Sequence, residues 1–191
     1  MQRLTGARVM LREFRQEDLS GIRSWVNDYD TARYLGAGYV RPQSWEQTES
    51  YLMSLLNGEA GGVHLAIADK ETKRYLGQCS LMMIDHTARR AELAIVLAPD
   101  SANHGSGREA IGLMLEYAFM QLNLNRVFLQ VHADNARAIH VYEKCGFKRE
   151  GCLRAHFYRD GRYIDAVQMG ILRDEWAGGQ AEPACTCCRA G

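Results

Sequence analysis

The feature that most constrains the fold is a strand-to-helix junction near the middle of the chain. Apolar residues 91–97 run into Gly105-Ser106-Gly107, and residues 108–122 then place apolar side chains on one helical face. Glycine accepts a positive φ and lets the backbone come close to a ligand, while free N–H groups at a helix start attract an anion. The junction therefore predicts a phosphate-binding turn, although a tight connection without any ligand uses the same residues.

A second strand-to-helix unit follows the first. Residues 126–132 have the pattern of a buried strand, and residues 135–144 have that of a helix that Asn135 caps and Gly146 ends. Because a strand at 91–97 crosses through a helix to a strand at 126–132, these two strands are expected to pair in parallel.

These residues resemble the GNAT superfamily of acyl-CoA-dependent N-acetyltransferases, and within it the branch of ribosomal-protein N-terminal acetyltransferases. The family's pyrophosphate loop, (Gln/Arg)-x-x-Gly-x-(Gly/Ala), corresponds to residues 102–107, and its Asn-x-x-Ala-x-x-x-Tyr-x-x-x-Gly-Phe motif corresponds to residues 135–147. The resemblance extends from Arg3 to Trp176. Ala102 departs from the usual Gln or Arg and removes a side-chain donor, but it leaves the backbone N–H groups in place.

The resemblance implies acetyl-CoA as co-substrate and assigns residues to it. The two parallel strands splay apart, and the pantetheine arm pairs with the backbone of the first strand. The residues implied in cofactor binding are Ile95, Val96, Leu97, Asn103, His104, Gly105, Ser106, Gly107, Arg108, Asn135 and Tyr142. Asn135 also suits a plain helix cap.

Tyr142 is the candidate general acid, because in the family pattern this tyrosine points at the thioester sulfur. A phenol with a pKa of ~10 can protonate a departing thiolate. The alternative is a core tyrosine that packs like Ile139 one turn earlier.

Glu92 is the candidate general base. Amines have pKa values from ~8 to ~10.4, so a proton must be removed before the nitrogen attacks. Glu92 interrupts an apolar strand, where desolvation would raise its pKa toward neutral pH. The alternatives are an ion pair with Arg89, Arg90 or Arg154, or a solvated strand end.

The order of elements predicts an α/β fold with a mixed sheet. A strand within residues 7–14, helices at 19–26 and 44–57, strands at 64–68, 75–84 and 91–97, the two units above and a hairpin at 151–172 give the order β-αα-βββ-α-β-α-ββ. This amounts to about seven strands and four helices in one domain, residues 1–176. The tail, residues 177–191, has no apolar periodicity.

Charge and cysteine content limit the partners and the location. Lys+Arg and Asp+Glu both number 23, so nucleic acid and anionic membranes are not expected partners, and neither a secretion signal nor an 18-residue apolar run is present. A cytoplasmic protein is expected, with a homodimer as the candidate assembly. Cys79, Cys145 and Cys152 are expected to act as small buried hydrophobes, and Cys185, Cys187 and Cys188 lack a fourth metal ligand nearby, so no metal is expected.

The sequence thus predicts an N-acetyltransferase in which a primary amine attacks acetyl-CoA directly in a ternary complex. A non-catalytic acyl-CoA-binding module is the alternative. A dinucleotide-binding oxidoreductase is disfavoured, because the glycine turn follows several strands and His132 stands where a ribose-binding acid is required.

The acceptor could be a protein N-terminus, a polyamine or a small amino compound. Residues 28–45 lie where relatives bind it, and they could hold a cation between aromatic faces through Asp28, Tyr29, Asp30, Tyr34, Tyr39 and Trp45.

Overall fold

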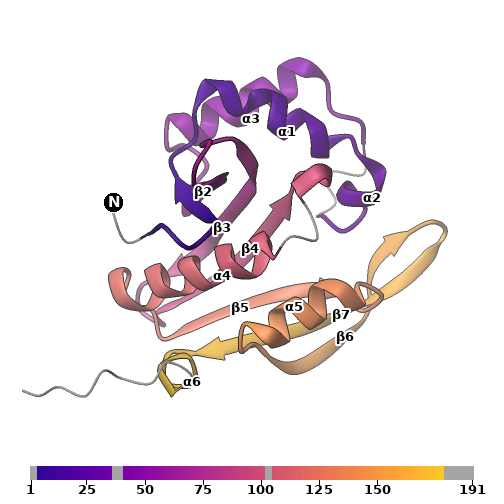
Figure 1. Ribbon diagram of the computed structural model, residues 1–191. Helices are drawn as coiled ribbons and strands as arrows, with labels where there is room; N and C mark the ends of the chain where they lie inside the picture. Colours follow the sequence, from indigo (N-terminus) through magenta and orange to yellow (C-terminus); the bar gives the residue numbers. More distant parts are fainter. Residues whose placement is uncertain (1–3, 36–40, 102–104, 179–191) are drawn as a thin grey trace, which may run out of the picture.

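A seven-stranded mixed sheet forms the centre of the computed structural model, which describes residues 4–35, 41–101 and 105–178 (Figure 1). The strand order is β1-β2-β3-β4-β5-β7-β6; β4 and β5 pair in parallel and the other neighbours pair antiparallel. The strands are β1 (Val9–Arg12), β2 (Val63–Asp69), β3 (Tyr75–Asp85), β4 (Arg90–Leu97), β5 (Arg126–His132), β6 (Lys148–Arg159) and β7 (Arg162–Leu172). The predicted α/β fold and strand number are confirmed.

Helices cover the two faces of the sheet in pairs. α4 (Ser106–Glu116) and α5 (Ala136–Lys144) share one apolar core with β3, β4 and β5, whereas α1 (Leu19–Val26) and α3 (Trp45–Leu56) pack a second core around the fully buried Trp25. Figure 1 shows α1 and α3 beside each other, away from α4 and α5. Within the described residues, no helix is both long and apolar enough to cross a membrane.

Two helix starts follow directly from the sequence. At α3 the Ser44 hydroxyl accepts from the Gln47 N–H at 3.2 Å, and the Gln47 side chain accepts from the Ser44 N–H at 2.8 Å, which is a capping box. At α4, Gly105 occupies the N-cap with φ of +78°. The predicted helix over residues 108–122 proves to be α4 followed by a π-helical turn, Tyr117–Gln121.

Two short helices and the exposure of one cysteine differ from what the sequence predicts. α2 (Tyr29–Ala32) and α6 (Arg173–Gly178) are additional to the four helices expected. They have four and six residues, too few for an apolar period to be recognised. Cys152 is exposed because β6 is an edge strand whose residues are mostly exposed, whereas Cys79 is buried and Cys145 half-buried.

The parallel strands β4 and β5 stay together for only three residue pairs. The register runs Arg90↔Arg126, Ala91↔Val127 and Glu92↔Phe128, and then stops. β4 continues alongside β3 as far as Leu97, and β5 continues alongside β7 as far as His132. The expected splay is therefore present, and it opens immediately after Glu92.

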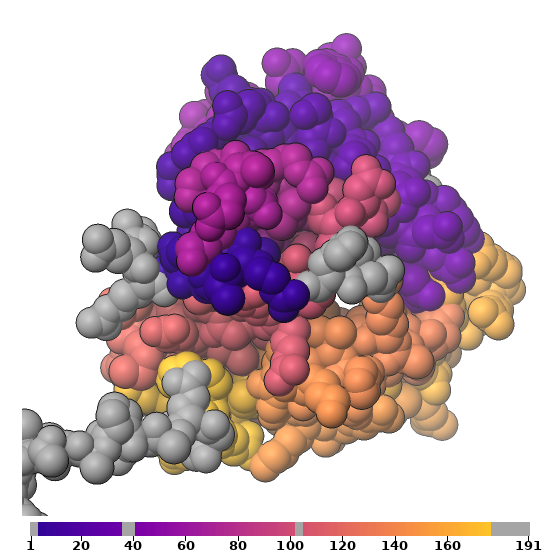
Figure 2. Space-filling model, viewed as in Figure 1, coloured from indigo at the N-terminus to yellow at the C-terminus, as the bar shows by residue number. Residues whose placement is uncertain are grey.

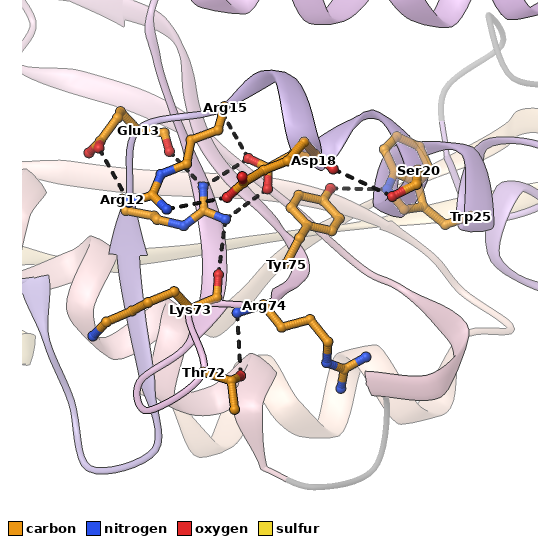
Figure 3. A network of polar contacts seen from close by, with 11 residues as sticks. Arg12, Glu13, Arg15, Asp18, Ser20, Trp25, Thr72, Lys73, Arg74 and Tyr75 are labelled. Carbon is orange, nitrogen blue, oxygen red and sulfur yellow. Dashed lines mark hydrogen bonds and ion pairs between the residues drawn. The ribbon is translucent and has the colours of Figure 1, made fainter.

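A buried ion pair holds the N-terminal elements together (Figure 3). The Arg12 guanidinium donates to both carboxylate oxygens of Asp18, at 2.8 and 2.7 Å, and also to the Lys73 carbonyl at 3.2 Å. The Arg15 N–H donates to the Asp18 carboxylate at 2.9 Å. Both side chains of the pair are almost fully buried, so β1, the start of α1 and the β2–β3 turn are joined through one pair of charges.

Candidate active site

The glycine turn before α4 has the geometry of a phosphate cradle. Gly105 adopts a left-handed conformation, and a Cβ on Gly107 would lie only 3.3 Å from the Leu97 side chain. Glycine at these positions therefore lets the helix start lie close to the end of β4. Ser106 is buried and Arg108 is exposed. Ala102, Asn103 and His104, the other loop positions, lie outside the described residues.

The backbone of Ile95, Val96 and Leu97 is paired on one side only. Across β3 these residues face Cys79, Gln78 and Gly77. On the other side β5 has already diverged, so among the described residues that edge of β4 has no strand partner. An extended amide-bearing chain such as pantetheine fits this edge in the manner of an added strand.

Asn135 caps α5, as its residue type predicts. Its side-chain oxygen accepts from the Ala138 N–H at 3.1 Å, and its own N–H donates to the His132 carbonyl at 2.9 Å. The cap fixes the carboxyl end of β5 against the start of α5.

Tyr142 is held by the way α5 ends. Gly146, with φ of +95°, donates its N–H to the Glu143 carbonyl at 3.0 Å, and Phe147 donates its N–H to the Tyr142 carbonyl at 3.0 Å. This is a Schellman motif. The rings of Tyr142 and Phe147 meet edge to face with centroids 5.8 Å apart, which is the apolar contact that accompanies the motif. The Tyr-x-x-x-Gly-Phe pattern thus encodes a helix end that positions the tyrosine.

The environment of Tyr142 favours its protonated form. Burial raises the pKa of its phenol, and the neighbouring Cys79 and Cys145 thiols add to the rise. Burial likewise raises the pKa of Cys145 to about 11. The phenol therefore keeps its proton at neutral pH and has it available to donate.

Glu92 lies on the other face of the sheet from Tyr142. Its neighbours Ala91 and Leu93 are buried in the core that Tyr142 packs against, and side chains alternate along a strand. Glu92 is half-buried, and burial raises the pKa of its carboxyl.

The alternative of an ion pair for Glu92 is not realised among the described residues. Arg90 pairs with Asp85 at 3.7 Å, and Arg89 donates to the Asn123 side chain at 2.8 Å. Of the described groups, none forms a salt bridge with Glu92. Its carboxylate remains available for proton transfer.

A cleft of about 500 Å³ lies where α1 and α2 meet the tip of the β6–β7 hairpin. In Figures 1 and 2 the yellow hairpin reaches the purple α2 region at the right edge of the molecule. His132 and Arg159, which the sequence analysis did not select, form part of its wall. The cleft contains His132, the last residue of β5, and therefore adjoins the splay between β4 and β5.

His132 is buried among aromatic rings. Its ring stacks on Phe157 with centroids 3.7 Å apart, and it meets the edge of Tyr34 at 5.7 Å. Burial lowers the pKa of the imidazole, and the nearby Arg159 lowers it further. Its Nε2 is buried with no hydrogen-bond partner in the described part of the chain. An alternating strand pattern ending at a histidine was the available signal, but it does not separate packing from a role in a cleft.

The acceptor residues expected between 28 and 45 have a different arrangement from the one predicted. The aromatic faces are present, but Arg33 lies over Tyr29 and Tyr34, and Arg159 also lies over Tyr34. Asp28 caps α2, Asp30 pairs with Arg33, and Trp45 is exposed with Arg23 above it. Tyr39 lies outside the described residues.

A glycine turn at a helix start beside an open strand edge, with a half-buried phenol on one face of the sheet and a carboxylate on the other, fits an acyl-CoA-dependent transferase. Residues 8–148 match the family model described as an acetyltransferase (GNAT) domain. The chain belongs to the GNAT acetyltransferase family and is an N-acetyltransferase that uses acetyl-CoA as its co-substrate.

Curated relatives refine the position within the family. The chain is 36% identical over 171 residues to a spermidine N(1)-acetyltransferase of Vibrio cholerae, covering 89% of this chain and 96% of the relative. A putative ribosomal N-acetyltransferase, YdaF of Bacillus subtilis, is 33% identical over 102 residues, which is only 53% of this chain and 56% of the relative. The expected membership of the ribosomal branch is therefore not supported.

Solved structures of spermidine N-acetyltransferases are also similar to this chain. The V. cholerae spermidine N-acetyltransferase in complex with CoA and spermine superposes with a TM-score of 0.79 at 29% identity, covering 90% of this chain and 99% of that one. A dodecameric structure of spermidine N-acetyltransferase from V. cholerae has a TM-score of 0.75 at 28% identity, covering 92% and 99%.

Proposed function

We propose that this protein acetylates a small primary amine that enters through the cleft beside His132, with Glu92 as general base and Tyr142 as general acid. The observation that carries the proposal is the splay of β4 and β5 directly after Glu92, with Glu92 on one face and Tyr142 on the other. The attacking nitrogen and the departing sulfur are different substituents of the tetrahedral carbon, so a base and an acid placed on different faces of the sheet can each reach one of them.

The proposed reaction proceeds by direct attack. The ammonium of the acceptor loses a proton to Glu92, and the nitrogen lone pair forms a bond to the thioester carbonyl carbon. The carbon–sulfur bond then breaks, and the thiolate takes the proton of the Tyr142 phenol. The nitrogen, which became positively charged on attack, releases its second proton to give the neutral amide, and that proton restores the phenol by way of solvent. The raised pKa values of both side chains suit these roles, because the carboxyl can hold a proton closer to neutral pH and the phenol does not lose its proton beforehand.

In this proposal acetyl-CoA binds through the α4 start, Ile95–Leu97 and Asn135. Arg108 and the loop positions Asn103 and His104 would complete the phosphate contacts. The named relatives make spermidine the first acceptor to compare, and they make a closed oligomer the assembly to look for, in place of a simple homodimer.

The test is a screen of primary amines with thiol release as the readout. The panel contains diamines and polyamines, amino acids, aminoglycosides and short peptides with a free N-terminus. Mass spectrometry of the product then identifies the acetylated nitrogen. A protein that binds acetyl-CoA and acetylates none of these compounds would contradict the proposal.

A further inference from the structure

The cleft beside His132 is lined by more positive than negative charge. Among its described lining residues Arg33, Arg41 and Arg159 are cationic, whereas Asp160 is the one carboxylate. Resting on the function proposed above, we infer that the acceptor amine carries a carboxylate on the same molecule, and that a polycation without one is a poor acceptor.

The carboxylate in the wall is already engaged. Asp160 accepts a hydrogen bond from the Tyr29 hydroxyl, and its other oxygen lies 3.4 Å from Arg159 and 3.9 Å from Arg33. An ammonium group that pairs with Asp160 would compete with these three partners. The exchange would leave two guanidinium groups less neutralised, which costs free energy at a partly buried site.

The carboxylates just outside the cleft are engaged as well. Asp134 is held by Arg159 and by Arg162, the latter at 3.8 Å. Asp30 lies 3.8 Å from Arg33, and Asp28 accepts both the N–H and the hydroxyl of Thr31. The local acids are therefore occupied in balancing the chain's own arginines.

Two aromatic faces at or beside the cleft, those of Tyr29 and Tyr34, already have arginines over them. Arg33 lies 5.4 Å from the Tyr29 ring centroid and 5.3 Å from that of Tyr34. Arg159 lies 4.9 Å from the Tyr34 centroid. The cation–π partners of Tyr29 and Tyr34 are thus arginines of the protein itself, so these two rings are less available to a polyamine.

Arg41 is the lining arginine that lacks a carboxylate partner. It is exposed, and in the described part of the chain no carboxylate lies within 4.0 Å of its guanidinium. Its fork of N–H donors matches the geometry of a carboxylate. Arg41 is therefore the residue assigned to the acceptor's anionic group.

His132 does not offset the positive charge of the arginines that line the cleft. The Arg159 guanidinium lies 3.4 Å from its Nδ1, and its Nε2 is buried without a partner among the described groups. A neutral imidazole contributes no charge to the cleft. Anion selection is consequently left to the arginines.

The test uses pairs of amines that differ in one carboxylate. Ornithine is compared with putrescine, and lysine with cadaverine, with spermidine as a further polycation. The measured quantity is kcat/KM for acetylation, and calorimetric binding to the CoA-saturated protein gives a readout that needs no turnover. The carboxylated member of each pair is expected to be favoured by about tenfold to hundredfold, the size of one charge-assisted contact.

Three variants assign that preference to a residue. Arg41→Gln should bring the ratio within each pair close to one, chiefly through KM of the carboxylated member, and Arg41→Lys should restore part of it. Arg74→Gln is the matched control, because Arg74 is an exposed arginine outside this cleft. It should leave the ratios as in the parent protein.

The outcomes separate the inference from the function on which it rests. Equal or better use of putrescine, cadaverine and spermidine would overturn the inference and leave the N-acetyltransferase proposal intact. A preference that survives Arg41→Gln would overturn the assignment of that residue. Bound acetyl-CoA with no acetylation of any amine in the wider panel would overturn both.

Discussion

Arg12 and the arginines that line the cleft beside His132 have opposite electrostatic surroundings. Arg12 is almost fully buried and, apart from its Nε, its donors are taken up by Asp18 and by the Lys73 and Glu13 carbonyls. The arginines that line the cleft beside His132 outnumber the lining carboxylate, and they border open space. Arg12 is neutralised within the fold, whereas the cleft keeps an excess of positive charge, which in our proposal serves a ligand. Complete pairing of a buried charge thus indicates a structural role, and an unbalanced cluster at a cleft indicates binding.

The largest expected effect is on the free energy of unfolding, and it comes from breaking the Arg12–Asp18 ion pair. Asp18→Ala leaves the Arg12 guanidinium buried without its counter-charge, so the free energy of unfolding should fall by about 3–5 kcal/mol. Chemical denaturation measures this. Glu17→Ala, at an exposed neighbouring carboxylate, should change it by less than about 1 kcal/mol. If Asp18→Ala cost as little as its control, the contrast between the two groups would be lost.

The next effect is on catalysis and should leave stability almost untouched. Tyr142→Phe removes the proton donor and keeps the ring that packs on Phe147, so kcat should fall about tenfold to a thousandfold with acetyl-CoA affinity retained. Tyr117→Phe, at a half-buried tyrosine packed on the same core, should keep the parent rate. Steady-state kinetics on both variants tests this, and equal rates would reduce Tyr142 to a packing residue.

Glu92 is a half-buried carboxylate with no salt bridge among the described groups, so it can be compared directly with Asp18, which is paired with Arg12. Its pKa is raised by burial, so the folded state disfavours its ionised form at pH values above the unfolded pKa. Glu92→Gln should therefore keep or slightly increase stability at pH 7, unlike Asp18→Ala. It should also lower the rate and remove the acidic limb of the kcat/KM profile. Glu116→Gln on α4 serves as control. A variant with the parent's pH profile would exclude Glu92 as base.

The smallest effect concerns the pH dependence of stability near His132. Its folded-state pKa is lowered, so on acidification through about 6.5 the unfolded chain takes up a proton that the folded chain does not. Its contribution to stability is present at pH 8 and declines as the pH falls. Thermal unfolding measures this as Tm, and the difference in Tm between the parent and His132→Asn should become smaller as the pH is lowered from 8 to 5.5. A constant difference would show that burial does not control this imidazole.

The sequence predicted those parts of the fold in which local pattern and tertiary environment agree. β5 was expected at its observed bounds because Val127, Leu129 and Val131 alternate toward one core. The start of α3 follows from the capping box at Ser44. α2 escaped prediction because its stability comes from Asp28 and from contacts of Tyr29 and Arg33 with the distant Asp160.

The candidate site was predictable where residues adjacent in sequence form it, and only there. The cradle at Gly105–Gly107, the Asn135 cap and the strand position of Glu92 are local features. The cleft depends on Arg33, His132 and Arg159, which come from three elements separated by many residues. Single residues of these types have no pattern that sequence alone can distinguish from a solvated surface. The aromatic rings expected around an acceptor cation are present at Tyr29 and Tyr34, where arginines of the chain lie over them, and the acceptor itself stays a prediction.

Because α5 ends at a fixed point before Gly146, the position of the Tyr142 phenol depends on the number of residues between Asn135 and Tyr142. A helix turns by about 100° per residue, so inserting or deleting one residue between Asn135 and Tyr142 would rotate the phenol away from the splay by that angle. The left-handed conformation at Gly146 and the Phe147 contact fix where α5 stops, and Asn135 fixes where it starts. The two ends together set the rotational phase of the helix. We therefore expect the spacing between cap and tyrosine to tolerate substitutions far better than changes in length.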